Sequence, residues 1–138
     1  MGGPVPYGSD TLRIVARRPE RAAGLGGTIY PWTPAGLARA LDGAGLLIDT
    51  TPLALSPTAE GSLPAPIPLD LLADGALVVS LVYHREPALL ARARARGLRV
   101  MDGAAMLIYQ AALAFTLMTG RDAPLDVMRA AFYAPTAR

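Results

Sequence analysis

The stretch "ALVVSLVY", residues 76–83, decides the fold class of this protein. It is nearly all apolar and directly follows a predicted helix that ends at Gly75. A continuous apolar run of this length is expected of a central strand in a parallel sheet, because both faces of such a strand are covered. The rest of the chain can be interpreted outward from this strand.

Short apolar or β-branched runs alternate with helical patterns on both sides of it. The other strands are predicted at residues 11–16, 27–32, 45–52 and 98–102, and the one at 45–52 is expected to be buried and to run into a loop. Helices are predicted at residues 19–25, 33–44, 69–75, 87–97, 103–119 and 125–133. Thr33 is expected to cap the second helix, with Pro34 at its first helical position. Strands that alternate with helices indicate βαβ units, so we expect an α/β protein, with a Rossmann-like parallel sheet and flanking helices.

Composition limits the class of protein further. With 138 residues, of which 52% are hydrophobic and 17% charged, the chain can form one domain, residues 1–138. A net charge of +2 gives little attraction for nucleic acid. The longest apolar stretch, residues 104–118, is shorter than the roughly 20 residues that a membrane-spanning helix needs. Because the first ten residues also lack a signal-peptide pattern, we expect a cytoplasmic protein that binds neither nucleic acid nor membranes.

Several kinds of chemistry are excluded by residue types that the sequence lacks. All thirteen basic side chains are Arg, and there is no Lys and no Cys. Schiff-base lysines, phosphate-loop lysines, disulfides, thiol catalysis and thiolate metal sites are therefore excluded. His84 is the only histidine, so no metal site is expected. No serine lies in a Gly-x-Ser-x-Gly motif, which leaves a serine hydrolase unsupported.

Candidate binding residues follow the predicted strands, because ligands bind at the carboxyl ends of the strands in such sheets. These residues are Arg17, Arg18, Arg21, Asp49, Thr50, Thr51, Tyr83, His84, Asp102 and Gly103. The three arginines suit a phosphate, as where a dinucleotide site selects NADP, but a solvated arginine cluster has the same composition. The threonines suit either a loop close to a ligand or a simple turn. A further group, Arg92, Arg96 and Arg99, shares one helical phase and is interpreted as a solvated helix face.

The stretch "MDGAAMLIYQAALAF", residues 101–115, raises a separate question. It predicts a helix that starts at an Asp-Gly turn, is apolar almost all the way round and is therefore expected to be buried, with Gln110 in its middle. A buried amide that lacks a partner costs about 1 to 3 kcal/mol. Gln110 is therefore expected to bond either a ligand or a neighbouring backbone carbonyl.

Four stretches, taken in order, resemble the shikimate dehydrogenase family with its quinate/shikimate relatives. The family patterns are strand-Asn-Arg-Thr-x-x-Arg-Ala, Asn-x-Thr-Pro-x-Gly, Asp-x-x-Tyr-x-Pro and Asp-Gly-x-x-Met-Leu-x-x-Gln-Ala-Ala-x-Ala-Phe. The matching stretches here are "ARRPERA" from residue 16, "DTTPLA" from 49, "SLVYHREP" from 80 and "DGAAMLIYQAALAF" from 102. The last stretch is the longest and most specific, and the order and spacing of all four agree. The resemblance covers residues 10–133.

The resemblance implies the C-terminal, NADP-binding half of a shikimate dehydrogenase. That enzyme transfers hydride between NADPH and 3-dehydroshikimate to give shikimate in aromatic amino-acid biosynthesis. By this resemblance Arg17 and Arg21 hold the adenosine phosphate of NADP, and Arg18 replaces a Thr of the motif. Thr50 would lie beside the cofactor.

The nicotinamide end and the substrate pocket are implied in the same way. Leu81 and Gly103 match positions that line the nicotinamide, with Met106 packed nearby. Tyr83 and Gln110 match the residues that this half contributes to the shikimate pocket, where substrate hydroxyls would satisfy the Gln110 amide. Residues 103–138 correspond to the C-terminal helical segment of the family.

The sequence also departs from the family patterns. Each departure weakens a cofactor contact or a tight turn: Ala16 and Asp49 stand for Asn, Ala54 for Gly, Ser80 for Asp, and Ala105 often for Gly. The family's N-terminal catalytic domain, with its Lys-Asp pair, is expected to be absent, so no catalytic residue is expected here.

The first nucleotide-binding strand and its glycine-rich turn are expected to be absent as well. In the doubly wound order 3-2-1-4-5-6 that strand is central. We therefore expect a partial Rossmann-like domain, either with two unpaired strand edges or with a sheet that closes across the gap.

Three hypotheses follow for the function. The first is an enzyme half that is inactive alone, with the choice between shikimate and quinate left open. The second is a non-catalytic remnant or interaction module, whose edges pair with an N-terminal portion or with a second copy in a homodimer. The third, an unrelated Rossmann-like binding domain, requires the helix around Gln110 to match by accident.

Overall fold

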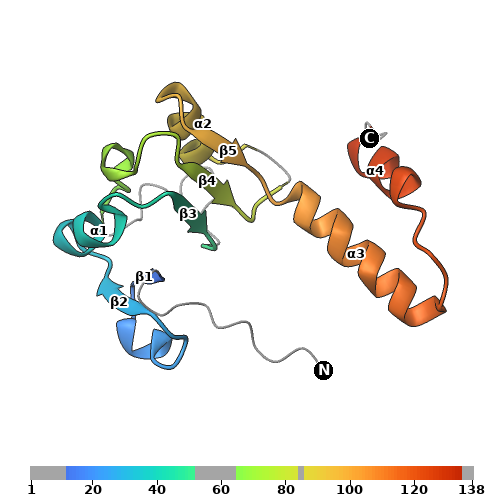
Figure 1. Cartoon of the computed structure of the whole chain (residues 1–138), viewed down its shortest axis with the longest axis horizontal. Helices are drawn as coiled ribbons and strands as arrows, with labels where there is room; N and C mark the ends of the chain where they lie inside the picture. Colours follow the sequence, from blue (N-terminus) through green and yellow to red (C-terminus); the bar gives the residue numbers. More distant parts are fainter. Residues whose placement is uncertain (1–11, 52–64, 84–85, 135–138) are drawn as a thin grey trace.

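The computed structural model describes residues 12–51, 65–83 and 86–134. Strands alternate with helices through this part of the chain (Figure 1). The strands are β1 (Arg13–Ala16), β2 (Thr28–Pro31), β3 (Leu46–Asp49), β4 (Leu77–Ser80) and β5 (Arg99–Met101). The helices are η1 (Pro19–Ala22), α1 (Pro34–Leu41), η4 (Leu69–Leu71), α2 (Ala88–Ala95), α3 (Ala104–Thr119) and α4 (Leu125–Tyr133), where η marks a 3-10 helix. The predicted α/β class is confirmed.

Local sequence signals explain where these helices begin and end. The hydroxyl oxygen of Thr33 accepts a hydrogen bond from the Gly36 amide at 3.1 Å, which confirms the predicted cap of α1. Gly120 ends α3 with a φ of +68°, a left-handed conformation that glycine adopts without a steric penalty. The helix predicted at residues 19–25 is only the four-residue η1, because glycines with positive φ follow it at 24, 26 and 27.

The strands form two separate parallel sheets. One contains β1 and β2, and the other has the order β3-β4-β5. β4 therefore lies in the middle of its sheet, where Val78 and Ser80 are both 0% exposed. The prediction from "ALVVSLVY" of a central strand covered on both faces is confirmed.

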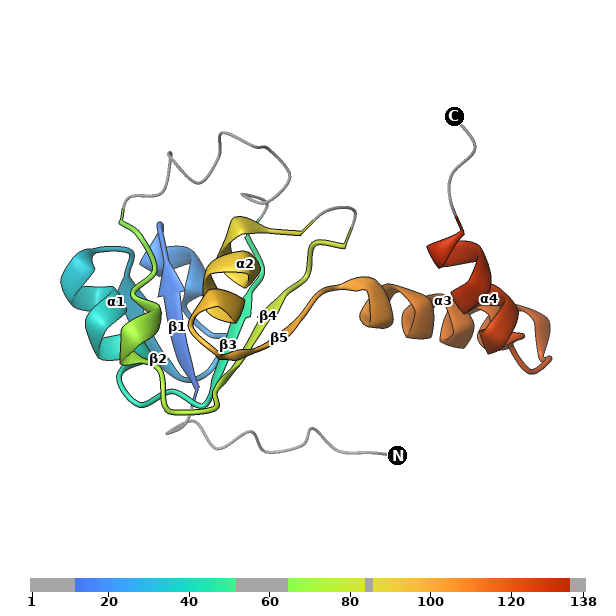
Figure 2. The ribbon, with the colours of Figure 1, turned by 90° about the horizontal axis from the view of Figure 1, so that it is seen from above.

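The two sheets lie edge to edge, with β1 and β3 as the neighbouring edge strands (Figure 2). We call the cavity of about 700 Å³ between them, lined by residues 12–15 of the β1 segment and 43–51 of the β3 segment, the inter-sheet cleft. In the doubly wound order 3-2-1-4-5-6, the strands β2, β1, β3, β4 and β5 take the places 3, 2, 4, 5 and 6. No described strand takes the central place, and the sheet does not close across the cleft.

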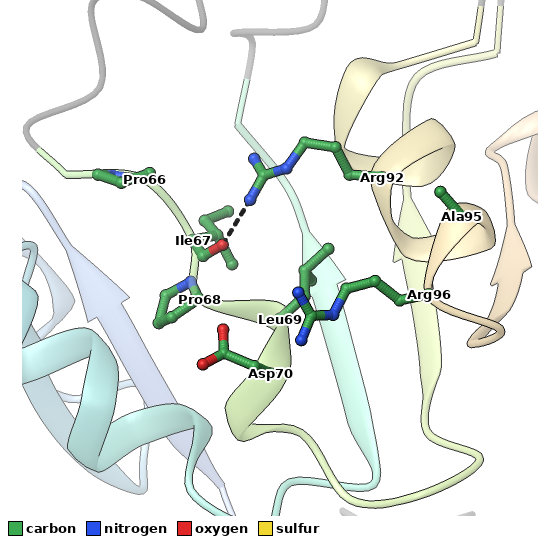
Figure 3. Close-up of a pocket in the computed structure, with 8 residues that line it drawn as sticks. All are labelled: Pro66, Ile67, Pro68, Leu69, Asp70, Arg92, Ala95 and Arg96. Atoms are coloured by element: carbon green, nitrogen blue, oxygen red, sulfur yellow. Dashed lines mark hydrogen bonds between the residues drawn. The ribbon is translucent and has the colours of Figure 1, made fainter.

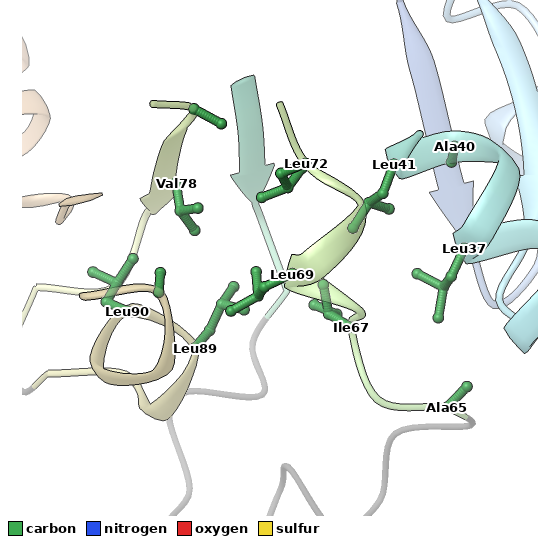
Figure 4. Close-up of a cluster of buried hydrophobic side chains, with 12 residues drawn as sticks. Leu37, Ala40, Leu41, Ala65, Ile67, Leu69, Leu72, Val78, Leu89 and Leu90 are labelled. Carbon is green, nitrogen blue, oxygen red and sulfur yellow. The ribbon is translucent and has the colours of Figure 1, made fainter. Parts of the chain in front are cut away.

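The two sheets are connected by a hydrophobic core and by one arginine. The core joins α1, the segment around η4, β4 and α2 (Figure 4). It consists of Leu37, Ala40, Leu41, Ala65, Ile67, Leu69, Leu72, Ala76, Val78, Leu89, Leu90 and Ala93. Nη1 of Arg13, on β1, donates hydrogen bonds to the carbonyl oxygens of Ala40 at 3.0 Å and Asp42 at 2.7 Å. β1 is thereby anchored to the carboxyl end of the helix that leads into β3.

The prediction that β3 is a buried strand is wrong. Leu46 is 53% exposed and Ile48 is 51% exposed, while Leu47 between them is half-buried. Successive side chains of a strand point to opposite faces. One face of β3 therefore packs on the core, and no described element covers the other.

The prediction that the helix around Gln110 is buried is also wrong. Figure 1 shows α3 leaving the sheets as a long helix with α4 folded back beside it. Only Ala104 and Ile108 of α3 are buried, and Gln110 is exposed. The apolar composition of α3 predicts burial, but the described residues offer it only α4 as a packing partner along most of its length. No described helix is long and apolar enough to cross a membrane.

Aromatic contacts hold α4 in place. Arg129 of α4 donates a hydrogen bond to the hydroxyl of Tyr109 on α3, and its guanidinium carbon lies 5.4 Å from the centre of the Tyr109 ring. The Phe132 ring centre lies 5.8 Å from that of Tyr83, which follows β4. We call residues 104–133 the α3–α4 arm.

The anchor between β1 and α1 can be tested with Arg13→Met, which keeps the aliphatic stem but removes the donors. We expect a loss of about 1 to 2 kcal/mol in the free energy of unfolding, measured with urea, because the Arg13 bonds are charge-assisted but partly exposed to solvent. Arg121→Met is the matched control, since no described group accepts a hydrogen bond from the Arg121 guanidinium. Equal stability of the two variants would contradict the anchoring role.

Candidate functional site

The carboxyl ends of β3, β4 and β5 meet at one edge of the larger sheet. The Leu81 amide, just after β4, donates to the Asp49 carbonyl at the end of β3 at 3.1 Å. The Gly103 amide, after β5, donates to the Val82 carbonyl at 3.2 Å. Three segments that are far apart in the sequence are thereby brought together at one edge, as expected of a ligand site in a parallel sheet.

Side-chain oxygens shape the turns at this edge. Oδ1 of Asp49 accepts a hydrogen bond from the Thr51 amide at 2.9 Å, and Oδ1 of Asp102 accepts one from the Ala104 amide at 3.0 Å. The buried hydroxyl of Ser80 accepts one from Val82 at 3.4 Å. Asp and Ser commonly bond the backbone two residues ahead in this way, so the departures from the family at 49 and 80 still give ordered turns.

Gly103 has room for no side chain. A Cβ at this position would lie 2.0 Å from the Leu81 carbonyl oxygen and 2.5 Å from its carbon. The two backbones can approach this closely only because residue 103 is glycine. One glycine therefore determines how closely the start of α3 approaches the segment after β4 at this edge of the sheet.

Four residues predicted to bind a cofactor lie on or next to this edge. Thr50 is exposed just after β3, Leu81 is half-buried after β4, and Gly103 is buried just before α3. Met106 lies in the first turn of α3 and is 48% exposed. The structure therefore brings Thr50, Leu81 and Gly103 together, with Met106 one turn away.

The predicted phosphate-binding arginines lie on the smaller sheet. Arg17 and Arg18 follow β1 directly, and Arg21 belongs to η1, whose turn is closed by the Arg21 amide bonding the Arg18 carbonyl at 3.0 Å. All three side chains are exposed, and no described carboxylate forms an ion pair with them. Three guanidinium groups within five residues, beside the single carboxylate of Glu20, fit the charge and geometry of a phosphate. No described contact joins these arginines to the edge formed by β3, β4 and β5.

The predicted substrate residues flank the same edge. Tyr83 is 45% exposed, and its ring packs against Phe132. Gln110 lies two turns into α3, and its amide bonds no described residue, which disagrees with the backbone-carbonyl hypothesis. Phe132 was not singled out from the sequence, because nothing in the pattern of residues 125–133 indicates which side chain reaches Tyr83.

The interpretation of Arg92, Arg96 and Arg99 as a solvated helix face is only partly right. Arg92 donates to the Ile67 carbonyl at 2.7 Å beside an open hollow of about 430 Å³ (Figure 3), and Arg99 donates to the Gly75 carbonyl at 2.9 Å. Both arginines hold loop backbone in place. The hollow is lined by apolar and proline residues together with the charged side chains of Asp70, Arg92 and Arg96.

Some sequence predictions concern residues without a described position. His84 and Ala54 lie outside the described residues, as do residues 1–11. Within the described ranges, no group of three or more His, Cys, Asp or Glu side chains could hold a metal ion.

Comparison with known proteins points to one family. A model of the shikimate 5'-dehydrogenase C-terminal domain matches residues 103–131, the stretch that begins at the close-packed Gly103. The chain is 40% identical over 132 residues to the shikimate dehydrogenase (NADP(+)) of Moorella thermoacetica and 42% identical over 124 residues to that of Nitrobacter hamburgensis. The family model and these relatives support the assignment of the chain to the C-terminal part of the shikimate dehydrogenase family.

Solved structures of shikimate dehydrogenases have the same fold. A structure from Thermus thermophilus, in complex with NADP(H) and shikimate, has a TM-score of 0.68 and 31% identity over 88% of this chain and 45% of that one. The Mycobacterium tuberculosis shikimate dehydrogenase has a TM-score of 0.67 and 27% identity over 89% of this chain and 47% of that one.

The chain spans less than half the length of these shikimate dehydrogenases. It covers 44% of the relative from Moorella thermoacetica and 42% of the one from Nitrobacter hamburgensis. The alignments include 88% and 86% of this chain, so the likeness extends well beyond the segment matched by the family model.

The close approach at Gly103 predicts a large effect of Gly103→Ala. We expect a loss of about 3 kcal/mol or more in the free energy of unfolding, measured by urea denaturation, because the methyl group would collide with backbone that cannot rotate away. Gly45→Ala is the control, since a Cβ there meets no atom within 4 Å. A Gly103→Ala variant as stable as Gly45→Ala would contradict the described packing.

Proposed function

We propose that this chain is the cofactor-side half of an NADP-dependent shikimate dehydrogenase, which reduces 3-dehydroshikimate to shikimate together with an N-terminal half. The observation that carries the proposal is the convergence of Thr50, Leu81 and Gly103 at one sheet edge, where the family match also begins. This edge is where parallel sheets of this kind bind their ligands.

The adenosine phosphate of NADP would be held by Arg17, Arg18 and Arg21. The three guanidiniums are exposed at the carboxyl end of β1 and are not neutralised by described ion pairs. Guanidinium forks bind phosphate oxygens through paired, charge-assisted hydrogen bonds. This cluster supports NADP rather than NAD.

The nicotinamide ring would lie against Leu81, Gly103 and Met106. Bound NADPH supplies the hydride, and the protein supplies position and surroundings for it. The rigid turn at Gly103 brings the backbone close to the ring site, and the half-buried Leu81 offers an apolar wall. The main task of these residues is orientation.

Tyr83 and Gln110 are the groups that this half would direct at the substrate. A polyol acid presents hydroxyls, and a phenol and an amide can both donate to and accept from hydroxyls. Gln110 has no described intramolecular partner, so its amide is available. The sequence contains no lysine, so the lysine of the family's Lys-Asp pair would come from the other half.

The α3–α4 arm supports the proposal that this chain works together with an N-terminal half. Its exposed apolar side chains are Met106, Tyr109, Leu113, Leu117 and Met118 on α3, with Val127 and Tyr133 on α4. Those at 106, 109, 113 and 117 are spaced three or four residues apart and form one stripe. A contiguous apolar surface of this kind marks an interaction site, and we assign it to packing against the N-terminal half.

A second candidate is a non-catalytic interaction module of the same fold. The absence of lysine and the exposed arm favour it, since both are compatible with a chain that only binds. The two candidates differ in whether the assembled protein turns over substrate.

The proposal is tested by mixing the chain with the N-terminal half of the Moorella thermoacetica relative and following shikimate-dependent reduction of NADP+. We expect activity only when both polypeptides are present, and weak or absent NADPH binding by the chain alone. Sub-micromolar NADPH affinity of the chain alone would contradict this expectation. Association without turnover would favour the interaction module.

The arginine cluster is tested in the same mixture with Arg17→Gln/Arg21→Gln. We expect kcat/KM for NADP+ to fall about 10- to 100-fold while that for NAD+ changes little, because the lost bonds are charge-assisted and specific to the extra phosphate. Arg121→Gln is the control with loss of one charge at a distant loop. A parallel fall with both cofactors would show that the arginines do not select the phosphate.

Gln110→Leu separates a pocket role from a structural one. We expect unchanged thermal unfolding of the chain, since residue 110 is exposed, and a rise of about tenfold or more in KM for shikimate in the mixture. Ala114→Leu, also exposed on α3, is the control. Loss of folding with Gln110→Leu would support a structural bond instead.

A further inference from the structure

We infer that the hollow between α2 and the segment around η4 is a binding site for a free α-amino acid with an apolar side chain. Two of its charged side chains, Asp70 and Arg96, have no part in the proposed function. The inference stands on residues of this chain alone and does not depend on that function.

The hollow lies toward the amino ends of β4 and β5. Asp70 belongs to η4, which comes before β4 in the chain, and Arg96 caps the carboxyl end of α2, which comes before β5. The residues proposed to bind the nicotinamide follow the carboxyl ends of the same strands. The hollow and the cofactor edge therefore lie at opposite ends of the sheet.

Hydrogen bonds and prolines hold the wall of the hollow in place. Nη2 of Arg92 donates to the Ile67 carbonyl at 2.7 Å, and Nε1 of Trp32 donates to the Ala65 carbonyl at 2.9 Å. The Ile67 side chain is buried in the core, and the prolines on either side of it fix the backbone φ. A wall that is ordered before a ligand arrives lowers the entropy cost of binding.

Two opposite charges line the hollow without neutralising each other. The Arg96 guanidinium comes from α2 and the Asp70 carboxylate from η4 (Figure 3). Both side chains are exposed, and they form no ion pair with each other. Neither side chain has a hydrogen-bond partner among the described residues. Both charges are therefore available to a ligand.

An amino acid with an apolar side chain is complementary to this lining. Its carboxylate suits the planar, five-donor guanidinium of Arg96, together with the remaining donors of Arg92. Its ammonium group suits the carboxylate of Asp70, which only accepts hydrogen bonds. Its side chain would lie against the prolines and Ala95, and the volume of about 430 Å³ is within the range of small-ligand sites.

Other small ligands match fewer of these groups. An inorganic anion would leave the apolar wall uncovered and would meet the like charge of Asp70. A simple carboxylic acid would cover the wall but would offer no donor to Asp70. Only a ligand that carries both charges and an apolar group uses the whole lining.

The test is a titration of the isotope-labelled chain with L-leucine, followed by the NMR shifts of backbone amides. We expect shifts at Ile67, Leu69 and Arg96, with a dissociation constant on the order of 1 mM, because the site is open to solvent. Glycine lacks the apolar side chain and isocaproate lacks the ammonium group. Each should bind at least about threefold more weakly than leucine.

Two substitutions separate the two charges. Asp70→Asn should weaken leucine binding at least about threefold without weakening isocaproate binding, because only leucine carries an ammonium group. Arg96→Gln should weaken the binding of both ligands. Asp74→Asn and Arg94→Gln are the matched controls, since they remove the same charges from neighbouring residues that do not line the hollow. Neither control should change the affinity for leucine.

All four side chains are exposed, so the variants should unfold at the same temperature as the unsubstituted chain. If one variant fails to fold, the comparison of leucine, glycine and isocaproate on the unsubstituted chain still decides the question. Absence of shifts up to about 10 mM leucine, equal binding of leucine and isocaproate, or unchanged leucine binding by Asp70→Asn would overturn the inference. Inorganic phosphate that binds as tightly as leucine would also overturn it, because the hollow would then select only a negative charge.

The titration contains neither an N-terminal half nor NADP. Its failure would leave the proposed function standing, and a failure of the proposed function would leave this site standing.

Discussion

The rest of this structure depends on one constraint. The backbone amides and carbonyls along the facing edges of β1 and β3 need hydrogen-bond partners, and no described strand provides them. Among the described strands, β1 and β3 each pair on one side only, and the amides and carbonyls on the other side face the inter-sheet cleft. Unpaired strand edges readily pair with another chain, and parallel sheets ordinarily bury both faces and all inner edges. The split into two sheets follows from this, because no described strand connects them. The core around α1 and the hydrogen bonds of Arg13 connect the two sheets instead.

The same constraint explains why so much apolar surface is exposed. Leu46 and Ile48 on β3 and Met106, Leu113 and Leu117 on α3 are all exposed. Fully burying a Leu or Ile side chain stabilises by about 1.5 to 3 kcal/mol relative to exposure. A partner that covers these surfaces would therefore gain several such contributions while completing the backbone pairing. The arginine cluster and the edge formed by β3, β4 and β5 belong to different sheets, so a strand between the sheets would also fix their relative position.

Local signals in the sequence predicted the parts of the fold that are determined locally. The apolar run at 76–83 indicated a central strand, and Thr33 indicated the start of α1; both are confirmed. The missing central strand predicted either two unpaired edges or a sheet closed across the gap, and the described strands form two separate sheets. Burial of β3 and α3 was predicted wrongly, because composition indicates that a surface needs cover and not whether the chain itself provides it. The Arg13 bonds and the Tyr83–Phe132 contact were not predictable, since they join residues more than 25 positions apart without any local pattern.

Hydrogen exchange of the isolated chain tests the central claim most directly, because it reports on each edge separately. The structure predicts slow exchange at the amides of Leu47 and Asp49, which face β4. It predicts exchange at least about tenfold faster at the amides of Leu46 and Ile48, which face the cleft. Equal protection of the two sets would mean that the edge of β3 is already paired, and would contradict the account of an open sheet.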